Sequence, residues 1–432
     1  MLAFSIIIIS AFVLSLLFQF EKTVIVMAVL SVVLQMPLVF GYSIFFILAL
    51  ISIVILLCKA DNYRTIISYP FIWVVALTIL TYIGTNLFSK GQPHWTIILR
   101  PIVCDMFFPL VFWHCLRYGK MSLRQLFAKC SLGFMMIFSI YGLFELLTNS
   151  NPIIESILNH KEMFSNNIGL SDRYRFGVRR LQSFFPFNGA LGLMSNISII
   201  LVTYIHSKLS YRKLYNGSNY IFLLFILVLM SLFTGTRSVF VGLLFAVVYL
   251  WYFYSRSSKS LSMIVGVMTL FLTILISGDY FWQIFNSFSN TQSVGGSHYD
   301  MREGQFTLAY SFMSSAGFWG NGFGFTDSYV QEFYREDILG AESVWLPLMI
   351  DMGYAGVLVY ALFLIYSLFL CLKTKSWAGV AVMLSFIATK TLTSAPGITN
   401  YYFLIYIIFY LAEVDKNKGI IERLNLLKKR EK

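Results

Sequence analysis

The stretch from Val344 to Leu372, VWLPLMIDMGYAGVLVYALFLIYSLFLCL, decides the fold. It is apolar over nearly its whole length, and a helix of this length crosses the hydrocarbon core of a membrane. Gly353 interrupts its first part, and glycine permits a backbone that is not helical. The stretch therefore predicts a short helix, a break near Gly353 and then a full membrane span.

Similar apolar runs recur along the chain, which is 58% hydrophobic and only 12% charged, whereas soluble domains have about 25% charged residues. The mean hydropathy is +0.74. The runs are continuous, unlike the alternating strands of an outer-membrane barrel. We expect an all-α, polytopic membrane helical bundle of about 12 or 13 transmembrane helices, forming one domain over residues 1–432. The runs are 2–19, 23–40, 43–58, 66–88, 98–116, 127–147, 186–206, 219–234, 238–254, 261–277, 344–372, 377–391 and 398–412.

Basic residues gather in the short connectors and explain the net charge of +12. Because cytoplasmic loops are enriched in Lys and Arg, we assign these connectors and the basic tail at 413–432 to the cytoplasm, and we expect no nucleic-acid partner. The loops 148–185 and 279–342 then face the outside. The orientation of the N-terminus stays open. About 13 spans would leave Met1 outside, and about 12 would place it inside. The connector residues are Arg117, Lys120, Arg124, Lys129, Lys208, Arg212, Lys213, Arg256, Lys259, Lys373 and Lys375.

The first outer loop, 148–185, is unusual in its cations. Outer segments are normally depleted in Arg, yet Arg173, Arg175, Arg179 and Arg180 lie close together here. Arginine binds phosphate through a planar, permanently charged fork, so an anion held at the outer leaflet would explain the cluster. A solvated loop, or pairing with the acidic loop that follows, is the alternative.

Arg237 lies in the turn Thr-Gly-Thr-Arg-Ser between two apolar runs. A charge in such a place is buried against a partner or faces a polar cavity. The first reading makes Arg237 a capping or snorkelling residue, and the second makes it part of an anion site.

The second outer loop, 279–342, is the longest polar interval of the chain, and its acids outnumber its bases. Arg302 begins a stretch that predicts an amphipathic surface helix, and Gly317 to Gly324 predicts a tight non-helical segment that shapes a mobile cover. Glu342 comes just before the next span. A carboxylate there fits a general base; an N-terminal cap or a salt bridge is the alternative.

Other chemistries have little support in the residues. The five histidines are scattered without the spacing of metal ligands, and no Gly-x-Ser-x-Gly elbow is present. The five cysteines lie in apolar runs or at their basic ends, so a disulfide framework is not indicated. We therefore expect no metal and no cofactor. Trp282, Tyr299, Trp319, Tyr329 and Trp345 are candidates for stacking on sugars, or for ordinary anchoring at the interface.

The motifs together resemble the O-antigen polymerase and O-antigen ligase superfamily. They are Arg179-Arg180-x-x-Ser-Phe-Phe-Pro-Phe-Asn-Gly, then Thr-Gly-Thr-Arg237-Ser, then Arg302 with a later Gly-x-Gly-Phe-Gly, then Glu342-Ser-x-x-Leu and Gly353-x-x-Gly356. The resemblance covers roughly residues 175–375. Ligases commonly have His at the position of Glu342, and this sequence departs from that.

The resemblance implies a metal-independent membrane glycosyltransferase of the GT-C type. It implies an undecaprenyl diphosphate-linked glycan as donor and as acceptor, with a chain-length regulator and a flippase as partners. Diphosphate would be bound by Arg179, Arg180, Arg237 and Arg302, and Glu342, Arg302 and Arg237 would be catalytic. We expect a polymerase of O-antigen, capsule, exopolysaccharide or lipopolysaccharide repeats in the cytoplasmic membrane, active on the outer face and with a cytoplasmic C-terminus. The ligase is the alternative, and a polysaccharide flippase is the other class.

Overall fold

The chain is almost entirely helical where the structure describes it. The computed structural model describes residues 2–58, 67–88, 95–118, 121–159, 174–175, 178–207, 217–255, 299–333 and 343–392. The prediction of an all-α chain is confirmed for these residues. The helices of the first half are α1 (Leu2–Phe18), α2 (Phe20–Gln35), α3 (Ile44–Cys58), α5 (Ile72–Phe88), α6 (Trp95–Pro101), the π-helix η1 (Ile102–Phe107), α7 (Phe108–Tyr118), α8 (Met121–Thr148) and α9 (Pro152–Asn159).

The helices of the second half are longer on average and contain the predicted site. They are α10 (Asn188–Ser207), α11 (Gly217–Phe233), α12 (Arg237–Ser255), α14 (Tyr299–Ala316), α15 (Phe325–Phe333), α16 (Trp345–Lys373) and α17 (Trp377–Thr391). Two short antiparallel hairpins complete the described elements. They pair β1 (Leu38–Val39) with β2 (Tyr42–Ser43), and β3 (Tyr174–Arg175) with β4 (Val178–Arg179).

Among the described helices, four are long and apolar enough to cross a membrane, by length and composition. These indicate a membrane protein. They are Ile97–Arg117, Leu123–Thr148, Asn188–His206 and Trp345–Lys373. The described residues do not reach the expected count of about 12 or 13 spans, because most of the other apolar runs form helices of only 10–17 residues. The shorter apolar helices are Ser5–Phe18, Ile44–Cys58, Ile72–Phe88, Tyr220–Phe233, Arg237–Tyr252 and Trp377–Thr391. The predicted runs 261–277 and 398–412, and the tail 413–432, lie outside the described residues.

The predicted break in the longest span is confirmed. Within α16, Gly353 has φ 58° and ψ −150°, which is not a helical conformation. Side chains with a Cβ rarely adopt a positive φ, whereas glycine does so without steric cost. The helix therefore changes direction at Gly353, as the sequence predicts.

The predicted surface helix is also confirmed, as α14. Gln305, Ala309 and Met313 are buried, whereas Phe306 and Tyr310 are exposed. Because side chains four positions apart share a helix face, these buried residues form one stripe. α14 packs on α16 through this stripe.

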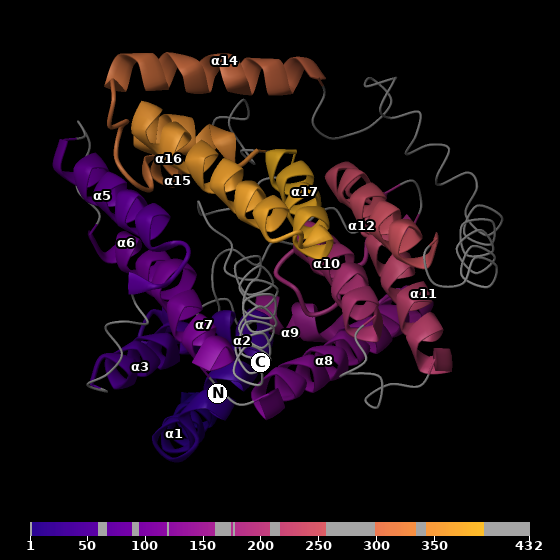
Figure 1. Cartoon of the computed structure of the whole chain (residues 1–432). Helices are drawn as coiled ribbons and strands as arrows, with labels where there is room; N and C mark the ends of the chain where they lie inside the picture. The colour runs from indigo at the N-terminus through magenta and orange to yellow at the C-terminus, as the bar shows by residue number, and fades with distance from the viewer. Residues whose placement is uncertain are drawn as a thin grey trace, which may run out of the picture.

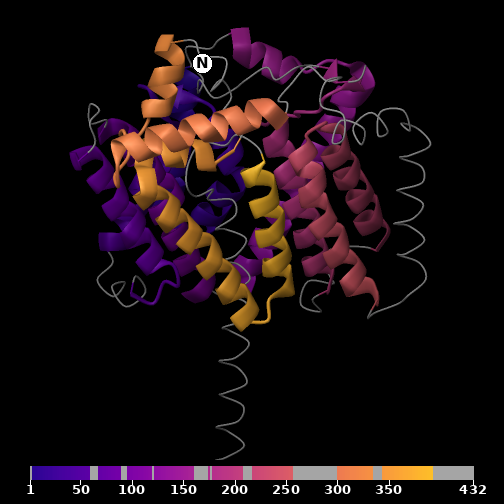
Figure 2. The ribbon, with the colours of Figure 1, turned by 90° about the horizontal axis from the view of Figure 1, so that it is seen from above.

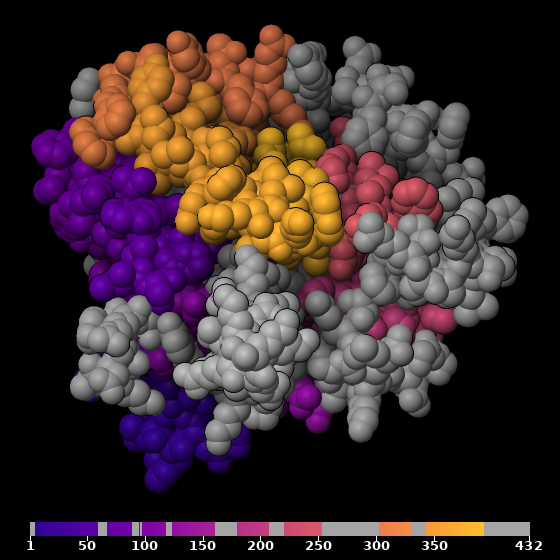
Figure 3. Space-filling model, viewed as in Figure 1, coloured from indigo at the N-terminus to yellow at the C-terminus, as the bar shows by residue number. Residues whose placement is uncertain are grey.

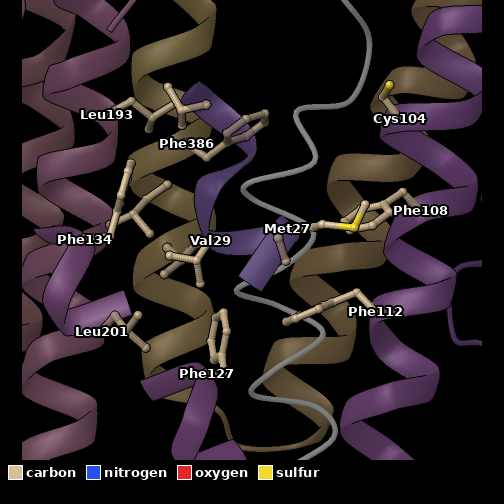
Figure 4. Packing of buried hydrophobic residues seen from close by; sticks show 14 of the residues in the cluster. Met27, Val29, Cys104, Phe108, Phe112, Phe127, Phe134, Leu193, Leu201 and Phe386 are labelled. Atoms are coloured by element: carbon tan, nitrogen blue, oxygen red, sulfur yellow. The ribbon is translucent and has the colours of Figure 1, made fainter. Parts of the chain in front are cut away.

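Large apolar side chains fill the interior of the bundle. Met27 of α2, Phe108 and Phe112 of α7, Phe127 of α8 and Leu201 of α10 are all buried and point toward a shared core (Figure 4). The rings of Phe112 and Phe127 meet edge to face with centroids 5.3 Å apart. Such pairs favour one arrangement of α7 on α8.

The helices that contain the predicted site gather on one side of the molecule. α12 packs against α17, α10 against α11 and α12, and α16 against α5, α14 and α17. Figure 1 shows α14 lying above the ends of α16 and α17, and the view from above in Figure 2 shows it running past the ends of the same two helices. In Figure 3, α5 (purple) and α12 (red) flank the orange and yellow surface of α16 and α17. We call the end covered by α14 the α14 end of the bundle.

Candidate functional site

Arg180 binds the turn that precedes α12. Its Nε donates a hydrogen bond to the Thr234 carbonyl oxygen at 3.0 Å, and its Nη2 donates to Thr236 Oγ1 at 3.1 Å. Gly235 between them has φ 63°, which closes the turn tightly because glycine accepts a positive φ. Since α12 begins at Arg237, the structure brings Arg180 and Arg237 to the same turn.

Arg237 is half-buried at the first position of α12. A guanidinium group has only hydrogen-bond donors. It cannot cap the amides at a helix N-terminus, because these amides are themselves donors and need an acceptor. The helix dipole places partial positive charge there as well. Local helix stability therefore does not explain Arg237, and the turn combines a helix N-terminus with a cation, which is the arrangement that binds anions.

Arg179, in contrast, is held inside the protein. Its side chain is 8% exposed, and its Nε lies 3.4 Å from Glu145 Oε1 of α8; it also donates to the carbonyl oxygen of Asn149. Glu145 Oε2 accepts hydrogen bonds from the amides of Gln182 and Ser183, at 3.1 and 2.6 Å. These contacts fasten the segment after β4 to α8, so the geometry assigns Arg179 the role of positioning its neighbour Arg180.

The start of α12 lies beside the end of α17. A Cβ atom added to Gly242 of α12 would lie 2.6 Å from Thr389 Oγ1 and 2.9 Å from Asn196 Nδ2. Asn196 of α10 in turn donates to the carbonyl oxygen of Val239 at 3.0 Å. Such close approach of three helices needs a residue without a side chain. The contact between Gly242 and Thr389 places Arg237, at the start of α12, at the same end of the bundle as the last turn of α17.

Two further segments meet the end of α17. Arg302 Nη2, in the first turns of α14, donates to the Leu392 carbonyl oxygen at 3.5 Å, which is at the long limit of a hydrogen bond. The amide of Val344, just before α16, donates to the Lys390 carbonyl oxygen at 3.1 Å. Arg302, the start of α16 and the end of α17 are therefore neighbours, and they lie at the same end of the bundle as the turn of Arg180 and Arg237.

Several predicted residues lie outside the described residues. These are Glu342, the predicted general base, together with Arg173 and residues 279–298 of the second loop. Arg175 lies in β3 of a short hairpin. Ser343 and Val344, which follow Glu342 directly in the sequence, are both buried at the end of α17.

The glycine-rich segment from Gly317 to Gly324 is packed into the break of α16 and does not form the expected cover. A Cβ atom on Gly320 would lie 2.4 Å from the Asp351 carbonyl oxygen, and one on Gly353 would lie 2.6 Å from the Gly320 nitrogen. The Asn321 amide donates to the Ile350 carbonyl oxygen at 3.1 Å. The positive φ angles of the glycines, from 76° at Gly320 to 120° at Gly322, serve this close contact between backbones.

Asp351 links the same segment to α15. Its carboxylate accepts hydrogen bonds from the Gly324 amide at 3.1 Å, the Thr326 amide at 2.7 Å and the Thr326 hydroxyl. An acid at a helix N-terminus satisfies amides that have no partner within the helix and complements the helix dipole. Sequence reasoning missed this role, because only the break in α16 brings Asp351 to the start of α15.

Three of the candidate sugar-stacking rings contact the protein itself. Trp319 stacks on Phe88 with centroids 5.7 Å apart, and Tyr329 packs edge to face on Phe312 at 5.2 Å. Trp345 packs edge to face on Tyr360, also at 5.2 Å. Their described contacts are therefore those of packing side chains. Trp282 lies outside the described residues.

Two polar side chains near Arg302 were also missed by sequence reasoning. Gln305 is 3% exposed, and its Nε2 has no hydrogen-bond partner in the part of the chain that the structure describes. Lys390 is 8% exposed. The spacing of Gln305, one helical turn after Arg302, was an available signal, since both then lie on the same face of α14. Two buried polar side chains thus lie on the same elements as the contact between Arg302 and Leu392.

Comparisons with known proteins assign no family to the chain. No family model matches it, and no curated protein matches it. Among the described residues, no group of three or more His, Cys, Asp or Glu side chains has the arrangement of a metal site. The function of the chain is therefore argued from the residues at the α14 end.

Proposed function

We propose that the chain is a membrane glycosyltransferase that polymerises undecaprenyl diphosphate-linked oligosaccharide repeat units of O-antigen, capsule or exopolysaccharide. The observation that supports the proposal is that Arg180, Arg237 and Arg302 lie at the same end of the bundle, on three elements far apart in the sequence. A lipid diphosphate bears several negative charges close to the membrane surface. Guanidinium groups from separate elements suit such a ligand, because each can bind a different oxygen pair.

In the proposed reaction, a hydroxyl oxygen of the acceptor sugar forms a bond to the anomeric carbon of the donor. The bond between that carbon and the diphosphate oxygen breaks, and undecaprenyl diphosphate leaves with the electron pair. Arg237 and Arg302 bind the diphosphate and stabilise the charge that builds on it, and Arg180 assists from the turn. Arg179 holds the segment of Arg180 in place.

Glu342 is the proposed general base, which takes the proton of the attacking hydroxyl. Support comes from its neighbours in the chain, since Val344 is bonded to Lys390 beside the Leu392 contact of Arg302. A base must reach the hydroxyl within hydrogen-bond distance, and the diphosphate must lie on the other side of the reacting carbon. The end of α17 is the place where both requirements can be met.

The proposal includes an orientation and a setting. The basic connectors and the basic tail lie in the cytoplasm of a cell whose cytoplasmic membrane the chain spans, and the α14 end faces outward. The fold is then of the GT-C type, in which helical spans support a site at the membrane surface. Its substrates come from a flippase, and a chain-length regulator is a further partner.

The test is an extension assay with the full chain in liposomes and a purified lipid-linked repeat unit as the sole substrate. A ladder of products is expected. Arg237→Ala, Arg302→Ala and Glu342→Ala should each lower the rate by about 10²- to 10³-fold, the usual effect of removing one charge-stabilising group. Arg117→Ala is the matched control and should leave the rate unchanged, because Arg117 lies in the last turn of α7, outside the proposed site, over the Trp113 ring.

The outcomes separate the candidate functions. Full activity of both Arg302→Ala and Glu342→Ala would show that the site is elsewhere. Transfer to a lipid A-core acceptor without any ladder would identify a ligase. In a deletion strain, lipid-linked repeats that accumulate on the inner face of the membrane would identify a flippase, whereas accumulation on the outer face agrees with a polymerase.

A further inference from the structure

Asn196 of α10 is a fully buried polar side chain that bonds to both helices beside the turn of Arg237. Its Nδ2 donates to the Val239 carbonyl oxygen of α12 at 3.0 Å, and its Oδ1 accepts from the Ser231 hydroxyl of α11 at 2.7 Å. Because the amide oxygen is the acceptor of that hydroxyl, the amide nitrogen is left to face α12. One side chain thus holds the two helices on either side of the turn at 234–236.

Val239 connects this contact to the two arginines of the turn. Its amide donates to the Thr236 carbonyl oxygen at 3.0 Å and closes the first turn of α12. Thr236 also accepts the hydrogen bond of Arg180 through its hydroxyl, and Arg237 is the next residue. The side chain of Val239 is held as well, since a Cβ atom on Gly192 of α10 would lie 2.4 Å from it. The backbone of Arg237 is therefore fixed from α10.

The same amide lies where α12 meets α17. A Cβ atom on Gly242 would lie 2.9 Å from Asn196 Nδ2 and 2.6 Å from Thr389 Oγ1. Thr389 is three residues before Leu392, whose carbonyl oxygen accepts the hydrogen bond of Arg302. Asn196 is thus placed between the turn at 234–236 and the end of α17.

Helix packing alone does not require an amide at this place. α10 already packs on α11 and α12 within the apolar core, and burying a polar group costs free energy unless its hydrogen bonds are made. Hydrogen bonds of Asn across membrane helices contribute modestly to stability. What they add is direction, since a group that stabilises charge must be held in one geometry by supporting hydrogen bonds.

We propose that Asn196 is the positioning residue of Arg237, and that it holds the first turn of α12 so that the guanidinium group is oriented before the diphosphate binds. The inference rests on the proposed function for the identity of that anion. Asn196 acts through Val239 and does not touch the substrate. Its removal should therefore matter only while Arg237 is present, whereas a residue that merely joins helices would matter equally with and without Arg237.

Two variants disturb the amide from opposite sides. Asn196→Leu keeps the approximate shape and removes both hydrogen bonds. Gly242→Ala adds one methyl group against the amide, in a substitution that favours the helix itself. Ser195→Ala is the matched control, because Ser195 is equally buried on α10 and its hydroxyl donates within the helix, to the Leu191 carbonyl oxygen at 2.8 Å. Each variant is also made together with Arg237→Ala.

The first measurement is the extension assay with the full chain in liposomes, expressed per folded molecule. Asn196→Leu and Gly242→Ala should each lower kcat about tenfold, the effect of one lost hydrogen bond in the transition state, and should change KM by less than about twofold. In the Arg237→Ala background neither should lower kcat by more than about twofold. Ser195→Ala should leave both constants unchanged.

The second measurement is binding of undecaprenyl diphosphate to the full chain in lipid nanodiscs. This lipid has the charge that develops on the leaving group, so its affinity reports on the orientation of Arg237 without any transfer of sugar. Asn196→Leu should weaken binding about tenfold when Arg237 is present and by less than about twofold when Arg237 is replaced.

Each outcome decides the question. Wild-type kcat and binding in Asn196→Leu overturn the inference, and equal losses in both backgrounds assign Asn196 to helix packing and overturn it too. Should Asn196→Leu fail to fold, Gly242→Ala decides by the same criteria. A wild type that binds the lipid but forms no ladder refutes the polymerase, and the binding data then decide the role of Asn196. A ladder with an unaffected Asn196→Leu does the reverse, and a wild type that neither extends nor binds overturns both.

Discussion

The pair of Arg179 and Glu145 offers a sharp test of which arginines are structural. We consider Glu145→Ala, Arg179→Ala and the double variant. Removing Glu145 leaves the buried Arg179 without its carboxylate and the amides of Gln182 and Ser183 without their acceptor. Removing Arg179 leaves Glu145 with both amide donors. The two single changes are therefore unequal, and the loss of Glu145 should be the worse.

The magnitude follows from these contacts. Breaking a buried ion pair by removing one partner costs about 3–5 kcal/mol, and an orphaned amide costs about 1–3 kcal/mol. We expect a loss of unfolding free energy of about 5 kcal/mol for Glu145→Ala and about 3 kcal/mol for Arg179→Ala. The double variant has no unpaired charge and should lose about 5 kcal/mol, which gives a coupling energy of about 3 kcal/mol.

The assay is equilibrium unfolding in mixed micelles, combined as a double-mutant cycle. Extension activity is measured on the same samples and expressed per folded molecule. Arg179→Ala should keep activity within about tenfold of wild type, a smaller loss than the roughly 10²-fold expected for a group that binds the diphosphate. Additive single effects, with coupling below about 0.5 kcal/mol, would refute the structural role. A loss of activity per folded molecule as large as that of Arg237→Ala would return Arg179 to the anion site.

Three further predictions concern the elements that hold the site. Gly353→Ala should lower the unfolding free energy by about 3 kcal/mol, from backbone strain and contact with the glycine-rich segment, whereas Gly133→Ala, which would meet nothing within 4 Å, should be neutral or slightly stabilising by thermal unfolding. Asp351→Asn should weaken the start of α15 by about 2 kcal/mol, and hydrogen exchange at the Gly324 and Thr326 amides should become faster; unchanged exchange would contradict the capping role. Extension should persist in EDTA, because guanidinium groups stabilise the leaving diphosphate; a loss that Mg²⁺ restores would argue for a bound metal.

Local features of the fold were predictable from sequence because their causes are local. The break in α16 follows from the conformational freedom of Gly353. The helix α14 follows from its periodic apolar residues, which bury Ala309 and Met313. Helix ends were less predictable elsewhere. The apolar run 23–40 predicts one helix, but α2 ends at Gln35 and the short strand β1 follows.

Partners distant in sequence were not predictable. Arg179 and Arg180 are adjacent and chemically identical, yet one pairs with Glu145 of α8 and the other with the turn at Thr234 and Thr236. Only the packing of α8 and α11 against the segment decides between them. The capping of α15 by Asp351 depends in the same way on a contact between separate elements.

The contacts of Arg180 and Arg302 suggest that the two arginines have different roles within the proposed anion site. Two hydrogen bonds hold Arg180 to the turn, so its guanidinium is oriented before any ligand binds, and a preoriented group needs no reorganisation when charge develops. Arg302 is partly exposed, and the hydrogen bond from its Nη2 to the Leu392 carbonyl oxygen is long, at 3.5 Å. Arg302 can exchange that long contact for a shorter one to phosphate. Arg302→Lys should therefore raise KM for the lipid-linked substrate more than it lowers kcat, because binding weakens while the preoriented groups remain, and the opposite split would refute these roles.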